Sequence, residues 1–370
     1  MKKFFTVVLA ALFVAACSSS DDSTDTNEGG NGTAFDRAAM LSNVADNIII
    51  PSYEALNTEL EALVTAKNNF NAIPNQTNLE ALRTAWLTAY KAWQHVEAFN
   101  IGLAEQTLYY FQMNTYPVNT TDVENNVSSG SYDLTHPNNN DAVGFPALDY
   151  MLYGLDLSDT AIIAKYDTNA DSSKYKTYLS DLVNQMKTLT QSVLSDWTTT
   201  YRDTFVARTA NTATSATNKF VNDFIFYYEK GLRANKIGIP AGNFSSTSLP
   251  DRVEAFYNKE VSRELALEGL QAVQNIFNGT HFGGSSNGES FRTYLISLDR
   301  SDLATQIINQ FNTARGKIQE LNTNFVTQIN TDNTKMTEAY DALQAAVVLL
   351  KVDMLQAFNI NVDFVDADGD

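Results

Sequence analysis

The chain has 370 residues and a formal net charge of −18. A nucleic-acid-binding protein presents a basic face, so this charge argues against a nucleic-acid partner. Hydrophobic residues make up 44% of the sequence, a share typical of folded globular chains. Three histidines and one cysteine exclude a multi-cysteine zinc site, a disulfide framework and a histidine-rich metal site.

The first segment has the features of an export signal. Two lysines follow Met1, and an apolar run from Phe4 to Ala16 comes next. This run is too short to span the ~30 Å hydrocarbon core of a membrane as a stable helix. Val14-Ala15-Ala16-Cys17 resembles the lipobox of bacterial lipoproteins, in which the cysteine is diacylated. We therefore expect residues 1–16 to be a signal peptide and Cys17 to carry the lipid; an unmodified thiol is the alternative.

Residues 17–34 form a polar, acidic and glycine-rich stretch. Such a stretch cannot bury enough apolar surface to offset its ordering entropy, so we expect a flexible tether. Acidic residues soon after the lipidated cysteine, beginning at Asp21, resemble signals that send lipoproteins to the outer leaflet; a tether that is polar without such a signal is the alternative. The predicted location is the outer membrane, reached through the lipid anchor, with the protein on the periplasmic or the cell-surface face.

From about Phe35 onward the hydrophobic pattern is helical almost throughout. Apolar residues recur every three or four positions, as amphipathic helices require. The clearest stretches are 79–101, 179–197, 253–277, 303–329 and 336–358. Long polar–apolar alternation is missing, so the sequence predicts an all-α protein.

A proline and three longer segments interrupt this helical pattern. Pro51 is expected to kink or restart the first helix. Residues 114–143, 236–250 and 278–289 are expected to be long connections, which are often functional.

The histidines offer little metal chemistry. His95, His136 and His281 are far apart in the sequence, and none has a second histidine three or four positions away. Glu97 follows His95 by two residues, so on a helix the two side chains point in different directions. We expect His95 to be a partly buried, hydrogen-bonded helix residue, with a ligand contact as the alternative.

Residues 144–154, Gly-Phe-Pro-Ala-Leu-Asp-Tyr-Met-Leu-Tyr-Gly, form the most informative segment. Pro146 suits the first turn of a helix, Asp149 would lie near its positive end, and Gly154 can close it. A short helix explains these residues without any chemistry.

The same segment resembles the Gly-x-His-x-x-Glu motif of the imelysin-like family, which lies in a stretch ending in Tyr-Leu-Leu and Gly. Three further regions resemble family segments in the same order along the chain: 93–102, 236–242 with 253–257, and 350–353 with the terminal 366–370. The resemblance covers nearly the whole chain after the signal peptide. It implies an all-α fold of two helical-bundle domains, 35–168 and 169–370, related by duplication and separated by a groove that holds the site. The four-residue match between Ala98–Ile101 and Ala357–Ile360 is what two related halves would produce.

The resemblance also implies an association with bacterial iron uptake, and the founding member was described as a metal-dependent peptidase. This chain departs from the motif, because Pro146 stands where the family has His and Asp149 where it has Glu. Proline offers no ligand atom, and a lone aspartate does not hold zinc. We therefore do not expect catalysis, and metal binding at Asp149 would be weak.

The sequence thus predicts a non-enzymatic outer-membrane lipoprotein that binds or relays an iron-related ligand, namely a metal, a siderophore or haem. A transport receptor or another uptake protein is the expected partner. The residues expected at the groove are His95, Glu97, Gly144, Pro146, Asp149, Arg233, Lys351 and Asp353. Carboxylates suit a hard cation, and basic side chains suit an anionic ligand. For each charged residue, a structural salt bridge is the alternative.

Two other functions remain open at this point. One is a residual metallopeptidase. The other is a surface component of a nutrient-uptake complex that binds a glycan or a protein on exposed aromatic side chains.

Overall fold

The computed structural model describes residues 35–364, and Phe35 onward forms one compact unit. The predicted signal peptide, Cys17 and the tether lie outside the described residues. The described part contains helices and a single isolated β-bridge, between Thr280 and Asn287. This confirms the predicted all-α fold.

The α-helices are α1 (Arg37–Val44), α2 (Ile50–Ala72), α3 (Gln76–Gln94), α4 (Leu103–Gln106), α5 (Tyr109–Met113), α6 (Thr120–Ser129), α7 (Gly144–Asp149), α8 (Asp159–Tyr166), α9 (Ser172–Asp196), α10 (Arg202–Ala207), α11 (Ala216–Phe226), α12 (Ile239–Ala241), α13 (Ser262–Asn278), α14 (Phe291–Ser297), α15 (Ser301–Gln319), α16 (Phe325–Val348) and α17 (Leu355–Phe358). Five π-helical segments extend or join them: η1 (Ala45–Ile49), η3 (Tyr150–Gly154), η4 (Trp197–Tyr201), η5 (Tyr227–Gly238) and η7 (Leu349–Met354). Two 3₁₀ turns, η2 (Pro137–Ala142) and η6 (Pro250–Arg252), complete the set.

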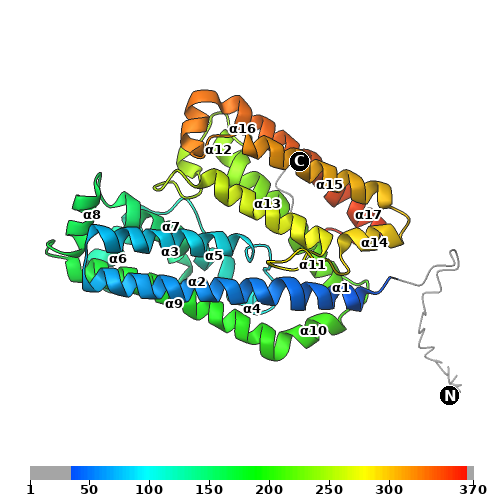
Figure 1. The fold of residues 1–370 in the computed structure, drawn as a ribbon, viewed down its shortest axis with the longest axis horizontal. Coiled ribbons are helices and arrows are strands. Elements are labelled where there is room, and N and C mark those ends of the chain that lie inside the picture. The colour runs from blue at the N-terminus through cyan, green and yellow to red at the C-terminus, as the bar shows by residue number, and fades with distance from the viewer. Residues whose placement is uncertain (1–34, 365–370) are drawn as a thin grey trace, which may run out of the picture. The chain divides into compact units, whose positions relative to one another are not determined.

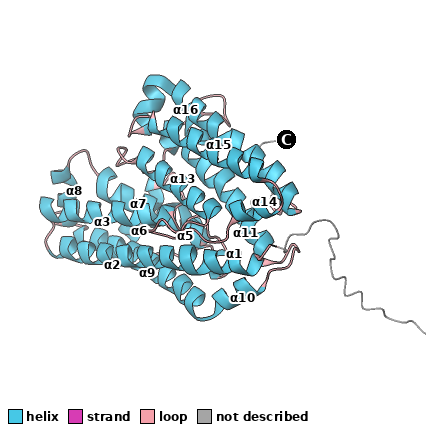
Figure 2. Cartoon of the chain, turned by 45° about the vertical axis from the view of Figure 1, so that its right-hand side comes forward, coloured by secondary structure: helices cyan, strands magenta, loops and turns pink. Residues whose placement is uncertain are grey.

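The long helices form two groups (Figure 1). In the first, α2 packs along both α3 and α9. In the second, α16 packs against α15 and η5, and α15 packs against α13. The groups meet where α13 contacts α3, and the view in Figure 2 shows α13 above the α2–α3–α9 layer.

The predicted division of the chain after residue 168 stays a prediction. The packing, however, places α9 with the helices that precede that boundary, because α9 lies along α2. A cut that separates the two helix groups therefore falls between α9 and η5, after the predicted boundary.

Local sequence explains where several helices begin and end. Pro51 occupies the first turn of α2, directly after η1, so the predicted kink or restart falls at a π-helical segment that joins α1 to α2. Asn75 accepts a hydrogen bond from the Asn78 amide and so caps α3, and a capping box at Ser290 starts α14. The expected long connection 114–143 is in part wrong, because α6 and η2 form within it.

The aromatic stripes of the sequence form the core. Trp86, Trp93 and Trp197 are at most 1% exposed, and each ring packs on other aromatic rings. Because these side chains lie along helix seams, they stabilise the fold by apolar burial. Within residues 35–364, no helix combines the length and apolarity that crossing a membrane requires.

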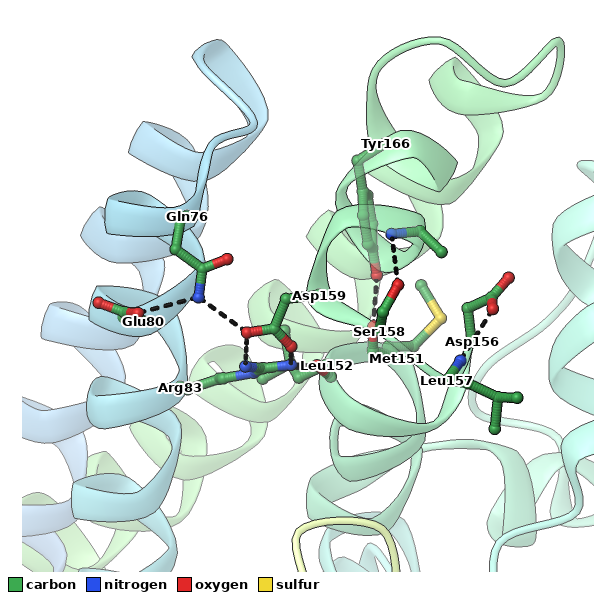
Figure 3. Close-up of polar contacts among 11 residues, drawn as sticks. Gln76, Glu80, Arg83, Met151, Leu152, Asp156, Leu157, Ser158, Asp159 and Tyr166 are labelled. Carbon is green, nitrogen blue, oxygen red and sulfur yellow. Dashed lines mark hydrogen bonds and ion pairs between the residues drawn. The ribbon is translucent and has the colours of Figure 1, made fainter.

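Arg83 on α3 holds the end of the segment 144–154 in place (Figure 3). Its Nε and Nη2 donate to the carbonyl oxygen of Leu152 at 3.1 and 2.7 Å. Its Nη1 and Nη2 also bind the two carboxylate oxygens of Asp159 at 2.9 and 2.7 Å. One planar guanidinium therefore joins α3, η3 and α8.

Candidate functional site

A cluster of buried polar side chains lies where the two helix groups meet, and we call it the polar centre. Its members come from α3 and the turn after it, the residue after α5, η5, and the segment that precedes α13. They are Gln94, Glu97, Asn114, Lys236 and Glu254. None of the five is more than 5% exposed, so each depends on partners inside the protein.

Lys236 is the only basic member of the polar centre. Its Nζ lies 2.9 and 2.8 Å from the two carboxylate oxygens of Glu254, and 3.2 Å from Oε2 of Glu97. Asn114 Nδ2 donates to Oε1 of Glu97 at 2.7 Å and to Oε1 of Glu254 at 3.0 Å. Gln94 Nε2 adds a bond to Glu254 Oε1 at 3.2 Å. Two carboxylates thus share one ammonium and two amide groups.

This arrangement leaves the polar centre with more acidic than basic groups. Burial raises the pKa of Glu97, and the neighbouring charge of Glu254 adds to the rise, while Lys236 and Asn114 oppose it. Burial alone would lower the pKa of Lys236, but the two glutamates outweigh it and raise that pKa above its usual range. The polar centre therefore keeps its ammonium charged and favours the uptake of a proton or another cation.

Tyrosines surround these charges. Tyr90 donates its hydroxyl to Asn114 Oδ1 at 2.6 Å. Burial, together with the charges of Glu97 and Glu254, raises the pKa of Tyr110, Tyr116 and Tyr227. Their phenols are consequently neutral oxygen groups facing the carboxylates.

Helix α13 passes the polar centre at Gly269. A Cβ at this position would lie 2.8 Å from the hydroxyl oxygen of Tyr227, 3.4 Å from Cε of Lys236 and 3.5 Å from Oε1 of Gln94. That Gln94 oxygen is buried with no hydrogen-bond partner among residues 35–364. The close approach of α13 to the polar centre thus requires a residue without a side chain.

The segment Val253–Val261, which we call the strap, connects η6 to α13 without regular structure. It brings Glu254 into the polar centre. Further along, the amides of Tyr257 and Asn258 donate to the two carboxylate oxygens of Asp149 at 2.7 and 2.9 Å. Asp149 is 2% exposed. The strap is therefore fastened twice, once by its own glutamate and once by an aspartate of α7.

Asp149 does not lie where the helix pattern placed it. It is the last residue of α7 rather than near its positive end, and its partners are amides of the strap. Burial raises the pKa of Asp149 to about 7, against the lowering effect of the two amides and Lys259. Its oxygens hold the strap in this structure.

The neighbouring motif positions shape the backbone. Gly144 has a φ of +72°, and a Cβ there would clash with the carbonyl oxygen of Met113. Pro146 is buried within α7. Both residues fix the path of the chain into Asp149.

Arg233 and Lys351, predicted at the groove, meet at a different acid. Glu229 Oε1 lies 3.6 Å from Arg233 Nη2, and Glu229 Oε2 lies 3.2 Å from Lys351 Nζ. Arg233 Nη1 also donates to the Tyr340 hydroxyl at 3.0 Å and to Gln344. These contacts correspond to the salt-bridge alternative for both basic residues.

The two remaining candidates lie elsewhere. His95 Nε2 is 3.1 Å from Oε2 of Glu268 and so links α3 to α13, which confirms the expected partly buried, hydrogen-bonded histidine. That contact is the main cause that lowers the pKa of Glu268. Asp353 is half-buried on η7.

The sequence analysis singled out Glu97 and Asp149 but missed their partners Asn114, Lys236 and Glu254 as site residues. Lys236 had a signal, since it is a lone charge in the otherwise apolar and glycine-containing run 236–242. Within residues 35–364, no group of three or more His, Cys, Asp or Glu side chains is arranged to hold a metal ion.

Two surface hollows are described on the protein. One, of about 460 Å³, is lined by residues of the stretch 207–215, and the other, of about 240 Å³, lies at η4 beside Asp46 and Ile50. Neither includes a residue of the polar centre or the strap. The side chains of the polar centre are at most 5% exposed, so the polar centre is closed in this structure.

Comparisons with solved structures agree on the fold. An imelysin-like protein from Psychrobacter arcticum has a TM-score of 0.70 at 17% identity, over 90% of this chain and 99% of that chain. A protein assigned as an iron-regulated protein A precursor from Parabacteroides distasonis has a TM-score of 0.66 at 16% identity, over 87% of this chain and 96% of that chain.

Sequence comparisons agree as well. The Iron-regulated protein A of Synechococcus elongatus is 22% identical over 285 residues, which are 74% of this chain and 73% of that protein. The family model described as Imelysin matches residues 49–352. The chain therefore belongs to the imelysin family.

Proposed function

We propose that this protein is a non-enzymatic lipoprotein that binds an iron-related ligand at the polar centre beneath the strap. The observation that carries the proposal is the ratio of charges there: two buried carboxylates share one ammonium. Both helix groups contribute side chains, so a ligand held there would contact both. The relative named Iron-regulated protein A supports iron as the element concerned.

The chemistry of the polar centre indicates the kind of ligand. The polar centre offers oxygen atoms of carboxylate, amide and phenol groups, and oxygen is a hard metal ligand. Hard oxygen donors suit a ferric ion or an oxygen-rich ferric chelate better than a soft metal. Lys236 would pair with the anionic part of such a chelate.

A peptidase is the less favoured function. A zinc-activated water needs about three protein ligands and an open coordination position. Pro146 supplies no ligand atom, and both oxygens of Asp149 accept hydrogen bonds from strap amides. Glycan binding on aromatic platforms is also less favoured, because all three tryptophans are buried in the core.

The proposed location is the outer membrane, with Cys17 as the lipid attachment site and a transport receptor as the partner. Labelling cells with an acyl-chain analogue tests the anchor: wild-type protein incorporates the label, and Cys17→Ala protein does not. Incorporation into both would refute Cys17 as the site.

The binding proposal is tested by titrating the mature protein, calorimetrically and by absorption, with ferric citrate, ferrous ion under anaerobic conditions, haem and zinc. We expect micromolar or tighter binding of an iron compound. Glu97→Gln and Glu254→Gln should each weaken it at least tenfold. Glu264→Gln, which changes an exposed carboxylate on α13, is the matched control. Absence of any heat or spectral change with every iron compound at micromolar concentration would refute the proposal, as would equal weakening by the control.

A further inference from the structure

The strap is irregular and partly exposed, unlike the helices of the core. It has no regular structure, whereas the helix that follows it, α13, is continuous over Ser262–Asn278. Its first part, Val253–Ala255, is buried, and Phe256–Glu260 is partly or fully exposed. Exposed irregular segments open at lower free energy than packed helices.

Two buried carboxylates fasten the strap to the body of the protein. Glu254 reaches inward to Lys236, Gln94 and Asn114. Asp149 reaches outward to the strap amides. Each fastening is a small set of hydrogen bonds to one carboxyl group, so losing either one frees a defined part of the strap.

The strap backbone is also held in an unfavourable conformation. Ala255 and Lys259 have φ values of +55° and +66°, in the left-handed region that residues with a Cβ rarely adopt. These two residues bracket the amides that bind Asp149. The closed strap thus depends on its fastenings to compensate for this conformation.

We propose that the strap is a lid over the polar centre, held shut by Glu254 and Asp149, and that its opening admits the ligand. The identity of the ligand rests on the function proposed above, whereas the motion stands on the contacts of the strap alone. Lys236, Glu97 and Glu254 are 1–5% exposed in the closed form. Opening of the segment that carries Glu254 withdraws that carboxylate from Lys236 and Asn114.

Opening of the lid is coupled to proton release from Asp149, and the burial of this carboxyl group determines the direction of the pH dependence. In the closed form burial raises the pKa of Asp149 to about 7, and in an open form water would solvate the same carboxyl and restore its ordinary affinity. The closed form therefore binds the proton more tightly, and a rise in pH toward and above 7 favours opening.

The groups around the two fastenings agree with this direction. Around Asp149 they are Lys259 and Tyr257 of the strap, Tyr90 of α3 and Tyr153 of η3. Around Glu254 they are Glu97, Lys236, Tyr90, Tyr110, Tyr116 and Tyr227. Burial raises the pKa of Glu97, as it does that of Asp149. The tyrosines and Lys236 titrate above neutral pH and do not oppose this direction.

Hydrogen–deuterium exchange of the intact mature protein, read by mass spectrometry and corrected for intrinsic rates, tests the lid without any ligand. In the wild type, peptides of the strap should exchange at least tenfold faster than peptides of α2 and α9. Their protection should fall at least fivefold between pH 6 and pH 8. Strap protection equal to that of α2 and α9 would overturn the proposal, since the strap would then open only with global unfolding.

Variants separate the two fastenings. Glu254→Gln should lower strap protection at least tenfold, and Glu264→Gln should leave it unchanged. Asp149→Asn should reduce the fall in protection between pH 6 and pH 8. A pH response that persists unchanged in Asp149→Asn would overturn the proton coupling. If the strap opens as stated but the protein binds no iron compound, the proposed function alone is refuted. If the protein binds an iron compound but the strap opens only with global unfolding, the lid alone is refuted.

Discussion

Lys236 and Glu254 form a two-pronged ion pair, with Nζ 2.9 and 2.8 Å from the two carboxylate oxygens, and both side chains are buried. The lysine belongs to η5 and the glutamate to the strap. Glu97 adds a third oxygen from the opposite helix group at 3.2 Å. One ammonium therefore joins three parts of the chain, and its removal affects all three.

We expect Lys236→Met to destabilise the protein by about 3–5 kcal/mol, because it leaves Glu97 and Glu254 buried without a counter-charge. Urea unfolding followed by circular dichroism at neutral pH measures the loss. A second change, Glu254→Gln, should recover part of the stability, since it removes one of the two stranded charges.

Lys91→Met is the matched control for this variant. Lys91 pairs with Glu264 at 2.6 Å across the same α3–α13 contact, but the two side chains are 35% and 46% exposed. An exposed ion pair contributes up to about 1 kcal/mol. Equal losses for the two variants would contradict a special role for the buried lysine.

Gly269→Ala should destabilise the protein by about 1–3 kcal/mol, the usual range for overpacking. The added methyl group would lie 2.8 Å from the hydroxyl oxygen of Tyr227, which then has to move. Adding Tyr227→Phe removes that oxygen and should restore part of the loss. Thermal unfolding measures both effects.

The control for this substitution is Gly316→Ala on α15, where a Cβ meets nothing within 4 Å. Replacing glycine by alanine in an open helix position should stabilise the protein by about 0.5–1 kcal/mol. If Gly269→Ala were also stabilising, the close approach of α13 to the polar centre would not be tight.

The fold could be predicted from the sequence because helical periodicity is local information. Apolar residues at three- and four-residue spacing in α3, such as Leu79, Leu82 and Trp86, are fully buried as expected. The prediction was wrong where short helices lack such a stripe. The connection 114–143 contains α6, a polar helix with only Val123 and Val127 buried.

The polar centre could not be assembled from the sequence. Gln94 and Glu254 are 160 residues apart, and nothing in their local patterns indicates contact. The strap was equally hidden, because Ala255 and Lys259 adopt positive φ values that their residue types disfavour. Asp149 was singled out as a motif position, but its partners are backbone amides. Every residue except proline has such an amide, so the sequence does not indicate which ones bind Asp149.

Arg83→Lys should lower stability by about 1–2 kcal/mol although it keeps the charge. Lysine cannot reproduce the planar set of bonds to Leu152 and Asp159, nor stack on the Tyr153 ring, whose centre lies 4.2 Å from the guanidinium carbon. Urea unfolding of the wild type and the variant measures the difference. Arg202→Lys, at a more exposed pair with Asp46, should lose less than half as much; an equal loss would contradict the joining role of Arg83.

Asp149 should make the protein less stable as pH rises through neutrality. Burial raises its pKa to about 7 from an ordinary value of 3.8. Between these values the folded protein holds a proton that the unfolded chain releases, so its stability falls by up to ~1.4 kcal/mol per pH unit. The contribution is complete only below the ordinary pKa of 3.8 and is lost as the pH rises through ~7. Asp149→Asn does not titrate, so the stability of the wild type relative to this variant should fall by about 2–3 kcal/mol between pH 5 and 8.

Unfolding in urea at both pH values, for wild type and variant, measures this difference, and the contributions of groups present in both proteins cancel. Asp159→Asn is the control with the opposite sign, because hydrogen bonds from Arg83 and Gln76 lower the pKa of Asp159. Its effect should be the same at pH 5 and pH 8, since both lie above that pKa. A flat difference for Asp149→Asn would mean that Asp149 stays ionised in the folded protein at pH 5, with the two strap amides outweighing the effect of burial.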